Sequence, residues 1–312
     1  MQSAASMSRS TGAIPTLHQL DAAIHAILGE SAPLMEVWSR TDCVDKTRGM
    51  EEWVKTQDGY RETPVESCAW YHGTWQYLRL LDMVATPSWY GFYNSALSEI
   101  LRNKPRANVL ISAAADYGML ATLHRAIEAA QGDPSIVIYD ICRTPLRSCE
   151  WYADRYGLTV KTVRGDLLED GVPEAPFDLI VTDEFLTVLK AQYKPMITQR
   201  WRELLRPGGS VVTTAMIGGA TTPELRDGYA RRARQLLSGR LDSFPHHNNG
   251  KAHLLVEHFD RFAGYHTRHM IDDEDQIRTL FSDFDELSYS ATATPGECVT
   301  PTNSFQIVAS LR

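Results

Sequence analysis

The sequence predicts an α/β protein built on a doubly wound, mostly parallel β-sheet, with a helical part in front of it. Between residues 108 and 215, short apolar runs alternate with stretches of helical length. This alternation is typical of a parallel sheet that is covered by helices on both faces. Residues 17–104 show mostly helical periodicity instead, and two strand-like runs close the chain. We therefore expect a helical lid over residues 1–106 and an α/β domain over residues 107–312.

The helical lid is expected to contain three helices. Apolar residues recur every three or four positions from Leu17 to Leu28, and this periodicity stops near Gly29. A second helix is expected over residues 66–84 and a third over residues 93–102, each followed by a proline. The second helix has an unusual density of aromatic side chains: Trp70, Tyr71, Trp75 and Tyr77.

Five strands and three helices are expected to alternate in the first half of the α/β domain. The strands are expected at residues 109–112, 136–140, 160–164, 177–182 and 210–215. The helices between them are expected at residues 120–130, 144–156 and 193–205. The last of these helices ends in Arg206-Pro207-Gly208-Gly209, which predicts a helix stop and then a tight turn into the fifth strand.

The rest of the chain predicts further helices and a closing hairpin. Helices are expected over residues 223–238, 252–262 and 273–281, with a loop at 241–250. The runs at residues 286–290 and 304–310 are strand-like and are separated by turn-forming residues. A terminal hairpin that closes an otherwise parallel sheet fits both runs.

Composition excludes several classes of protein. Of 312 residues, 43% are apolar and 22% charged, which is typical of globular chains and not of a disordered one. No run approaches the ~18 consecutive apolar residues of a membrane-spanning helix. With 31 basic and 39 acidic side chains the net charge is −8, which disfavours binding to nucleic acid phosphates. We expect a small-molecule substrate, and neither nucleic acid nor a membrane as partner.

The cysteines and histidines do not form a known metal-binding motif. Five cysteines are an odd number, too few for a disulfide framework in this length, and none forms a Cys-x-x-Cys pair. The histidines of the segment 246–269 lack the spacing of a zinc-binding helix, so no metal site is expected. Free thiols are typical of a reducing compartment, and residues 1–15 lack the apolar core of a secretory signal. A cytoplasmic protein is therefore expected.

Acidic residues stand at the ends of three consecutive predicted strands. Asp140, Asp166 and Asp183 are separated by 26 and 17 residues. In doubly wound sheets, ligands bind beyond the carboxyl ends of the strands, and carboxylates there are suited to a nucleoside. The alternative is that each acid caps the helix that follows it.

The order of these motifs resembles that of the class I S-adenosylmethionine-dependent methyltransferase superfamily over residues 108–312. The matching segments are residues 109–118 as the first motif, 138–142 as the acidic second strand end, 165–167 as the adenine motif, 177–183 as the fourth-strand motif, 205–209 as the turn before the fifth strand, and 304–309 as the reversed last strand. The resemblance implies a seven-stranded Rossmann-like sheet and S-adenosylmethionine as the cofactor.

The resemblance also implies candidate site residues. Those expected to bind the cofactor are Ser112, Ala113, Ala114, Gly118, Asp140, Ile141, Asp166, Leu167, Thr182 and Asp183. Those expected near the reacting atoms are Asp116, Tyr117, Tyr71 and His72. The family pattern of an acid followed by three alternate glycines falls on Ser112, Ala114, Asp116 and Gly118, so only the last glycine is kept. Either Asp116 takes over the contact to the amino group of the cofactor, or the methionine arm is held in an altered conformation.

Methyl transfer to a small molecule is the activity that the resemblance favours. An alternative is attack of the amino group of the cofactor on its own γ-carbon, which would give azetidine-2-carboxylate and methylthioadenosine. The aromatic second helix would suit either, since aromatic faces attract a sulfonium cation, although such rings also serve as ordinary core. A protein that binds the cofactor without turnover stays open, as does a homodimer. A dinucleotide-binding oxidoreductase needs Gly-x-Gly-x-x-Gly, which residues 112–118 lack.

Overall fold

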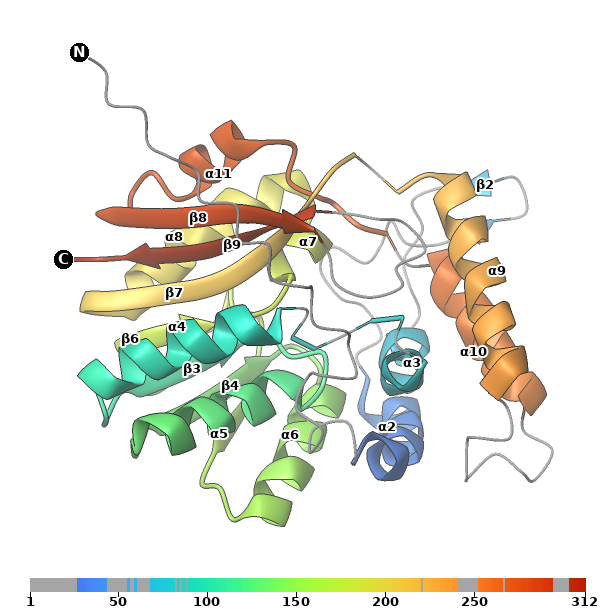
Figure 1. Cartoon of the computed structure of the whole chain (residues 1–312), viewed down its shortest axis with the longest axis horizontal. Coiled ribbons are helices and arrows are strands. Elements are labelled where there is room, and N and C mark those ends of the chain that lie inside the picture. Colours follow the sequence, from blue (N-terminus) through green and yellow to red (C-terminus); the bar gives the residue numbers. More distant parts are fainter. Residues whose placement is uncertain are drawn as a thin grey trace.

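The computed structural model describes residues 27–43, 55–56, 59–60, 68–81, 83–84, 86–87, 89–219, 221–240, 252–265, 267–293 and 303–312. Among these residues, a large β-sheet carries helices on both faces, and a second group of helices lies beyond one end of the strands (Figure 1). None of the helices in the described segments has the length and apolar character needed to cross a membrane.

The sheet has seven strands in the order β5-β4-β3-β6-β7-β9-β8. Their bounds are β3 Asn108–Ser112, β4 Ser135–Asp140, β5 Lys161–Arg164, β6 Phe177–Val181, β7 Leu205–Ile217, β8 Glu286–Ala293 and β9 Asn303–Ser310. The first five of these strands pair in parallel, whereas β9 is antiparallel to both β7 and β8. The predicted mostly parallel sheet and its terminal hairpin are therefore confirmed.

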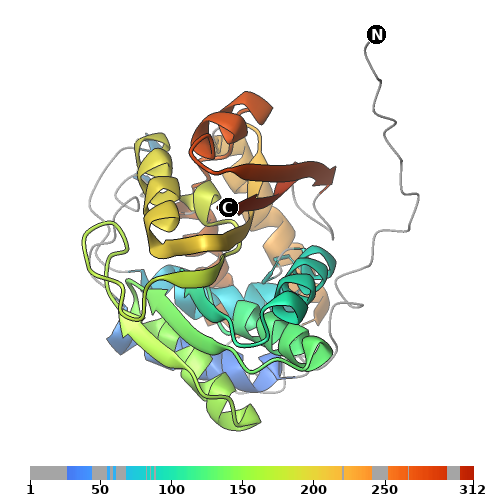
Figure 2. The same cartoon turned by 90° about the vertical axis from the view of Figure 1, so that its left-hand side faces the viewer.

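Helices cover both faces of the sheet, which is why its central strands are apolar on both sides (Figure 2). One face packs against α4 (Tyr90–Asn103), α5 (Gly118–Ala130) and α6 (Arg143–Tyr156). The other face packs against α7 (Phe185–Val188), α8 (Lys194–Leu204) and α11 (Glu274–Leu280), with a short 3-10 turn, η2 (Ala191–Tyr193), before α8.

A bulge stands where the sequence predicts a tight turn before the fifth strand. Leu205 of β7 pairs with Phe177 of β6, and the next paired residues are Ser210 and Leu179. Residues 206–209 therefore lie opposite one residue of β6, and Gly208 has a φ of 75°, which glycine adopts without strain. The turn predicted at residues 206–209 therefore lies within β7.

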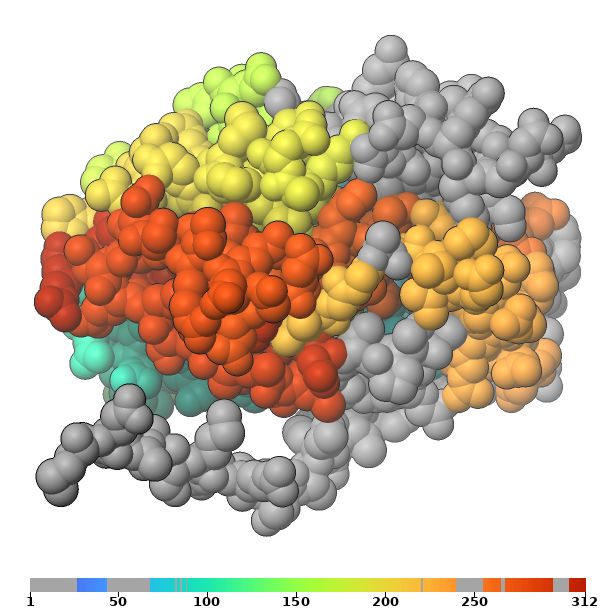
Figure 3. Space-filling view, turned by 90° about the horizontal axis from the view of Figure 1, so that it is seen from above, coloured from blue at the N-terminus to red at the C-terminus, as the bar shows by residue number. Residues whose placement is uncertain are grey.

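Four helices form a separate apolar core, which we call the helical cap. They are α2 (Leu28–Asp42), α3 (Ala69–Leu80), α9 (Pro223–Arg240) and α10 (Ala252–Tyr265). Seen from above, α9 lies toward one end of the molecule, and α8 and α11 lie over the sheet toward the other end (Figure 3). The boundary predicted after residue 106 separates α2 and α3 from α9 and α10, yet these four helices share one core. The helix α4, which also precedes the boundary, packs on the sheet instead. A two-stranded sheet, β1 (Lys55–Thr56) and β2 (Gly59–Tyr60), precedes α3.

The start of α2 differs from the prediction. The predicted helix over residues 17–28 lies outside the described residues except for its last two positions, and α2 begins at Leu28 and continues through Gly29. A helical glycine costs about 1 kcal/mol relative to alanine. Burial of Leu28 and Met35 on one face of α2 outweighs that cost, so the expected stop near Gly29 is wrong. The loop predicted at 241–250 also lies outside the described residues.

Glu36 of α2 connects three helices of the cap. Its carboxylate accepts hydrogen bonds from Tyr77 of α3 (2.9 Å) and Arg40 (2.6 Å), and His258 Nε2 of α10 lies 3.7 Å from it. Burial alone would raise the pKa of this carboxyl, but its partners outweigh burial and lower the pKa from 4.5 to about 2. The folded state therefore favours the charged form.

Acid is expected to weaken the cap through Glu36. The contribution of Glu36 to stability is fully present above pH 4.5 and is lost as the pH falls toward 2. Glu36→Gln is expected to cost roughly 1–3 kcal/mol at neutral pH, and the variant should lose less stability on acidification. Urea denaturation at several pH values measures both effects. Glu128→Gln, which removes the exposed carboxylate that pairs with Arg125 and His124, is the control and should cost under ~1 kcal/mol. The same pH dependence in Glu36→Gln and the wild type would contradict the assignment.

Candidate functional site

The carboxyl ends of the parallel strands meet at one edge of the sheet, where the strand order reverses. From β3 the chain proceeds to β4 and β5 on one side and then returns to β6 on the other side. Such a reversal point is where doubly wound sheets bind their ligands. Ser112, Asp140 and Val181 end the three strands that meet there, β3, β4 and β6.

The loop after β3 is fixed by its backbone to the end of β4. Ala113 has a φ of 63°, which is rare for a residue with a Cβ, and its N–H donates to the carbonyl of Tyr139 (2.9 Å). The next N–H, that of Ala114, donates to Asp140 Oδ2 (2.9 Å). Ser112 is fully buried, and its hydroxyl accepts a hydrogen bond from Trp201 Nε1 of α8 (3.0 Å). The Ser112 side chain therefore contacts α8, which lies on the opposite face of the sheet from α5.

Asp140 organises the turn that follows β4. Its Oδ2 accepts from Ala114, and its Oδ1 accepts from the backbone N–H of Cys142 (2.7 Å). Burial raises the pKa of this carboxyl to about 7. Ile141, between the two residues of this turn, is half-buried. The two hydrogen bonds fix the orientation of the carboxylate and leave further lone pairs on both oxygens.

Asp116 lies in a buried ion pair that connects the loop to the helical cap. Its side chain is fully buried and pairs with Arg79 of α3, and Gln76 Nε2 of the same helix donates to it (3.2 Å). The other carboxylate oxygen accepts the N–H of Gly118 at the start of α5 (2.8 Å). Arg79 also lies over the ring of Tyr117, 5.5 Å from its centroid. The residue expected to contact the cofactor thus also joins α3 to α5.

Tyr117 and Gly118 are enclosed by neighbouring elements. The Tyr117 ring is fully buried and stacks on Tyr152 of α6, with centroids 5.3 Å apart, and burial raises the pKa of its phenol. A Cβ at Gly118 would lie 2.1 Å from the carbonyl oxygen of Thr86. Gly118 is the only glycine of the family pattern that the first motif keeps. It is required because the backbone at Thr86 passes too close for a side chain at this position.

Tyr71 lies among stacked aromatic rings at the meeting point of the cap and the sheet edge. Its ring stacks on Trp75 (5.1 Å) and on Phe262 of α10 (5.6 Å). Burial raises the pKa of the Tyr71 phenol, and the negative charges of Asp116, Asp183 and Asp140 raise it further. The negative charges of these three carboxylates therefore favour the protonated form of this phenol.

The end of β6 carries a second polar network. Tyr93 of α4 donates to the carbonyl of Thr182 (2.6 Å), and Thr214 of β7 donates to Asp183 Oδ1 (2.9 Å). Burial raises the pKa of Tyr93 well above its usual value, so its hydroxyl stays protonated. The Thr182 hydroxyl is buried and has no hydrogen-bond partner among the described residues. Glu184, which follows, accepts from the backbone N–H of Met216 (2.8 Å).

The predicted adenine motif forms a turn of its own after β5. Asp166 Oδ1 accepts the N–H of Leu168 (3.0 Å), and the backbone N–H of Asp166 donates to Asp170 (2.7 Å). The Leu167 side chain is buried in the core on the α8 face, and its carbonyl accepts from Arg200 (3.1 Å). Asp166 therefore has a capping role here, and its contact with adenine stays a prediction.

His72, expected near the reacting atoms, lies with three cysteines. Its neighbours Cys43, Cys68 and Cys142 come from distant parts of the chain, and the four side chains form a group able to hold a metal ion. The sequence analysis expected no metal site, because these residues form no local motif. Arg79 was not predicted as a site residue, and its partner Asp116 lies 37 residues away in the sequence.

The arginines of α9 line a surface groove of about 390 Å³ between α9 and α10. Arg226 donates to the carbonyl of Gly264 (2.8 Å) and to the Thr267 hydroxyl, and Arg234 pairs with Asp260 (2.8 Å). These guanidinium groups thus join α9 to α10 and to the segment that follows it.

Similarity to known proteins is found among solved structures. No family model matches the sequence, and no curated protein does. Solved structures that are similar include TehB of Haemophilus influenzae (TM-score 0.43, 11% identity), over 70% of this chain and 62% of that one. This chain therefore spans less than two thirds of the TehB chain. Magnesium protoporphyrin IX methyltransferase ChlM of Synechocystis, with bound S-adenosylmethionine, is similar over 72% of this chain and 80% of its own (TM-score 0.43, 11% identity). The N-methyltransferase NodS of Bradyrhizobium japonicum, in complex with S-adenosylhomocysteine, is similar over 70% and 86% (TM-score 0.42, 13% identity).

The strand order and the reversed last strand of this chain are those of the Rossmann-like methyltransferase fold, as the resemblance of the sequence implied. The function proposed below rests on the residues of this chain.

Proposed function

We propose that the chain is an S-adenosylmethionine-dependent transferase whose cofactor binds beyond the ends of β3, β4 and β6. The observation that carries this proposal is the position of the Asp140 carboxylate, which the backbone N–H groups of Ala114 and Cys142 hold at the reversal point of the sheet. The buried Thr182 hydroxyl, unpaired within the described segments, fits the same site, since a buried polar group without a partner is costly unless a ligand meets it.

Each predicted binding residue has a distinct role in this proposal. Asp140 accepts the ribose hydroxyls, because the turn around it holds its carboxylate in one orientation. Ala113 and Ala114 supply the backbone of the loop over which the methionine arm lies, and Ile141 covers the ribose. Asp166 and Leu167 border the adenine, and Thr182 and Asp183 border the reacting end of the site.

The acids and rings around Tyr71 suit a cationic ligand. When bound, S-adenosylmethionine supplies a methyl group on a positively charged sulfur, which a nucleophile displaces to leave S-adenosylhomocysteine. Aromatic rings such as those of Tyr71 and Trp75 attract a cation, and the carboxylates of Asp140 and Asp183 would add to that attraction. Alignment and exclusion of water supply most of the rate in such displacements.

The candidates for proton transfer differ in their surroundings. Asp116 is held by Arg79, and Tyr117 is buried against α6, so neither side chain is placed for easy exchange of a proton. The Tyr71 phenol is protonated near neutral pH because its pKa is raised. We therefore assign Tyr71 a role in orienting the substrate by donating a hydrogen bond, with methyl transfer to a small molecule as the proposed reaction.

A second candidate reaction is intramolecular cyclisation at the same site. The groups that would hold the amino end of the methionine arm extended are engaged elsewhere, Ser112 by Trp201 and Asp116 by Arg79. In this reaction the amino nitrogen forms a bond to the γ-carbon and the bond from that carbon to sulfur breaks. One proton leaves the nitrogen, and the products are azetidine-2-carboxylate and methylthioadenosine.

Incubating the pure protein with S-adenosylmethionine and resolving the products by mass distinguishes the two reactions. For methyl transfer we expect S-adenosylhomocysteine only when a small-molecule acceptor is added. Methylthioadenosine above the spontaneous background, without any acceptor, would favour cyclisation over methyl transfer. Tyr71→Phe keeps the stacked ring and removes the hydroxyl, so it should slow turnover about tenfold with little effect on cofactor affinity. Failure of calorimetry to detect S-adenosylmethionine binding would contradict both reactions.

A further inference from the structure

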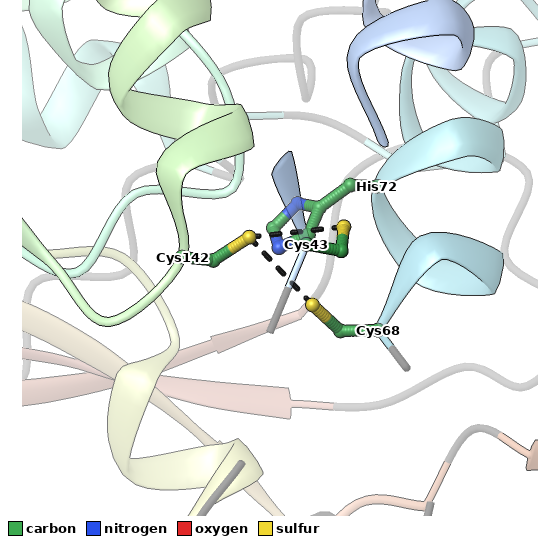
Figure 4. Close-up of side chains that lie close together, drawn as sticks. All are labelled: Cys43, Cys68, His72 and Cys142. Atoms are coloured by element: carbon green, nitrogen blue, oxygen red, sulfur yellow. Dashed lines mark hydrogen bonds between the residues drawn. The ribbon is translucent and has the colours of Figure 1, made fainter. Parts of the chain in front are cut away.

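Three cysteines and one histidine meet at the junction between the helical cap and the sheet edge. Cys43 directly follows α2, Cys68 directly precedes α3, His72 lies in the first turn of α3, and Cys142 follows β4. Figure 4 shows their side chains pointing toward one another from these separate elements. Their ligating atoms all lie within 4.8 Å of one another.

The distances between the sulfur atoms match the edges of a tetrahedral metal site. Cys68 Sγ lies 3.6 Å from Cys142 Sγ, which lies 3.7 Å from Cys43 Sγ. Zinc–sulfur bonds of about 2.3 Å in a tetrahedron place neighbouring sulfurs about 3.8 Å apart. A disulfide bond would place them about 2.05 Å apart, and all three cysteines are free thiols. The spacing is thus that of ligands sharing one ion.

The imidazole of His72 completes the donor set. It is 7% exposed, and its Nδ1 is buried without a hydrogen-bond partner in the part of the chain that the structure describes. A ring nitrogen of His72 lies within 4.8 Å of the three sulfur atoms, so its lone pair can bind the same ion. Cys68 and His72 are four residues apart, so the first turn of α3 presents both toward the same point.

We propose that these four residues bind a single zinc ion that fastens the helical cap to the sheet edge. Three thiolates and one imidazole form a Cys₃His set, which is typical of structural zinc and disfavours magnesium or calcium. Four protein ligands leave no open position, so the ion is structural and does not take part in the reaction. His72 is accordingly a metal ligand in this proposal, in place of the role near the reacting atoms that the sequence predicts.

The zinc site also acts on the proposed cofactor site, an inference that rests on the function proposed above. The backbone N–H of Cys142 donates to Asp140 Oδ1 (2.7 Å), so an ion bound to the Cys142 sulfur fixes the turn that orients Asp140. Loss of the ion should therefore weaken S-adenosylmethionine binding about three- to tenfold, the scale of one hydrogen bond.

Elemental analysis of the full chain, purified with a reductant, tests the site. We expect about one zinc per chain in the wild type and less than about 0.1 in Cys68→Ser and Cys142→Ser. Cys149→Ser is the matched control, because Cys149 is a buried free thiol outside the cluster, and it should keep its zinc. In case the serine variants do not fold, replacing zinc with Co²⁺ in the wild type should give the intense visible absorption of a tetrahedral thiolate site.

Several results would overturn the zinc site. These are a metal-free wild type that takes up neither Zn²⁺ nor Co²⁺, iron together with labile sulfide, or a disulfide among the three cysteines. Zinc content does not depend on the cofactor, so its measurement stands even if S-adenosylmethionine does not bind. Unchanged S-adenosylmethionine affinity in protein stripped of zinc would refute the coupling to Asp140.

Discussion

Replacing Arg79 with methionine is expected to lower the free energy of unfolding by about 3–5 kcal/mol, the cost of breaking a buried ion pair from one side. The Arg79 side chain is 6% exposed and that of Asp116 is fully buried, so the variant would leave the Asp116 charge uncompensated. Arg79 also donates to the carbonyl of Thr86 (3.3 Å), which would lose this partner. Urea denaturation of the two proteins measures the difference.

Two further variants show whether burial of the charge is the cause. Arg125→Met removes an exposed partner of Glu128 and should cost under ~1 kcal/mol. Combining Arg79→Met with Asp116→Asn removes both charges, so this double variant should be more stable than Arg79→Met alone. An Arg79→Met variant within ~1 kcal/mol of the wild type would show that Asp116 does not depend on this pair.

The outcome bears on how the cap and the cofactor loop are connected. Asp116 touches Arg79 and Gln76 of α3 through one oxygen and the start of α5 through the other. If this pair fixes the loop, Arg79→Met should also weaken the binding of S-adenosylmethionine. A family glycine at this position could not make these contacts, so the divergence of the first motif has a structural reason.

The sheet could be predicted from the sequence because its signal is local. Strands such as β3 and β6 are buried on both faces, so they appear as uninterrupted apolar runs such as Val109–Leu110–Ile111. The hairpin of β8 and β9 could be predicted from its two strand-like runs and the turn-forming residues between them, although no residue of β8 is buried. The start of α2 could not, since Gly29 is a local signal, whereas the packing of α2 against α3 joins residues far apart in the sequence.

The candidate site could be predicted only in part. The ends of β3, β4 and β6 were predicted and do meet at the reversal point of the sheet, while the roles of Asp116, Asp140 and Asp183 there stay predictions. The contacts that position them come from residues far away in the sequence. The cysteines and histidine of the cluster are 25, 4 and 70 residues apart in order, and no spacing rule joins them before the chain is folded.

Replacing Asp140 with alanine is expected to weaken S-adenosylmethionine binding by roughly 1.5–3 kcal/mol, or about 10- to 150-fold, the scale of hydrogen bonds to a charged group. Asp140 also holds the N–H groups of Ala114 and Cys142, so a weaker affinity alone does not locate the ribose. An analogue of the cofactor without the 2′ and 3′ hydroxyls separates the two effects. If Asp140 binds these hydroxyls, the wild type and Asp140→Ala should bind the analogue almost equally.

Asp133→Ala is the matched control for this measurement. Asp133 is exposed and lies just before β4, at the end opposite to Asp140, so its loss should leave affinity for S-adenosylmethionine and for the analogue unchanged. Calorimetry with both ligands, on variants whose thermal unfolding shows them to be folded, gives the four affinities needed. If Asp140→Ala loses affinity for the analogue as much as for S-adenosylmethionine, Asp140 shapes the loop without contacting the ribose. If the affinity for both ligands is unchanged, Asp140 does not belong to the site.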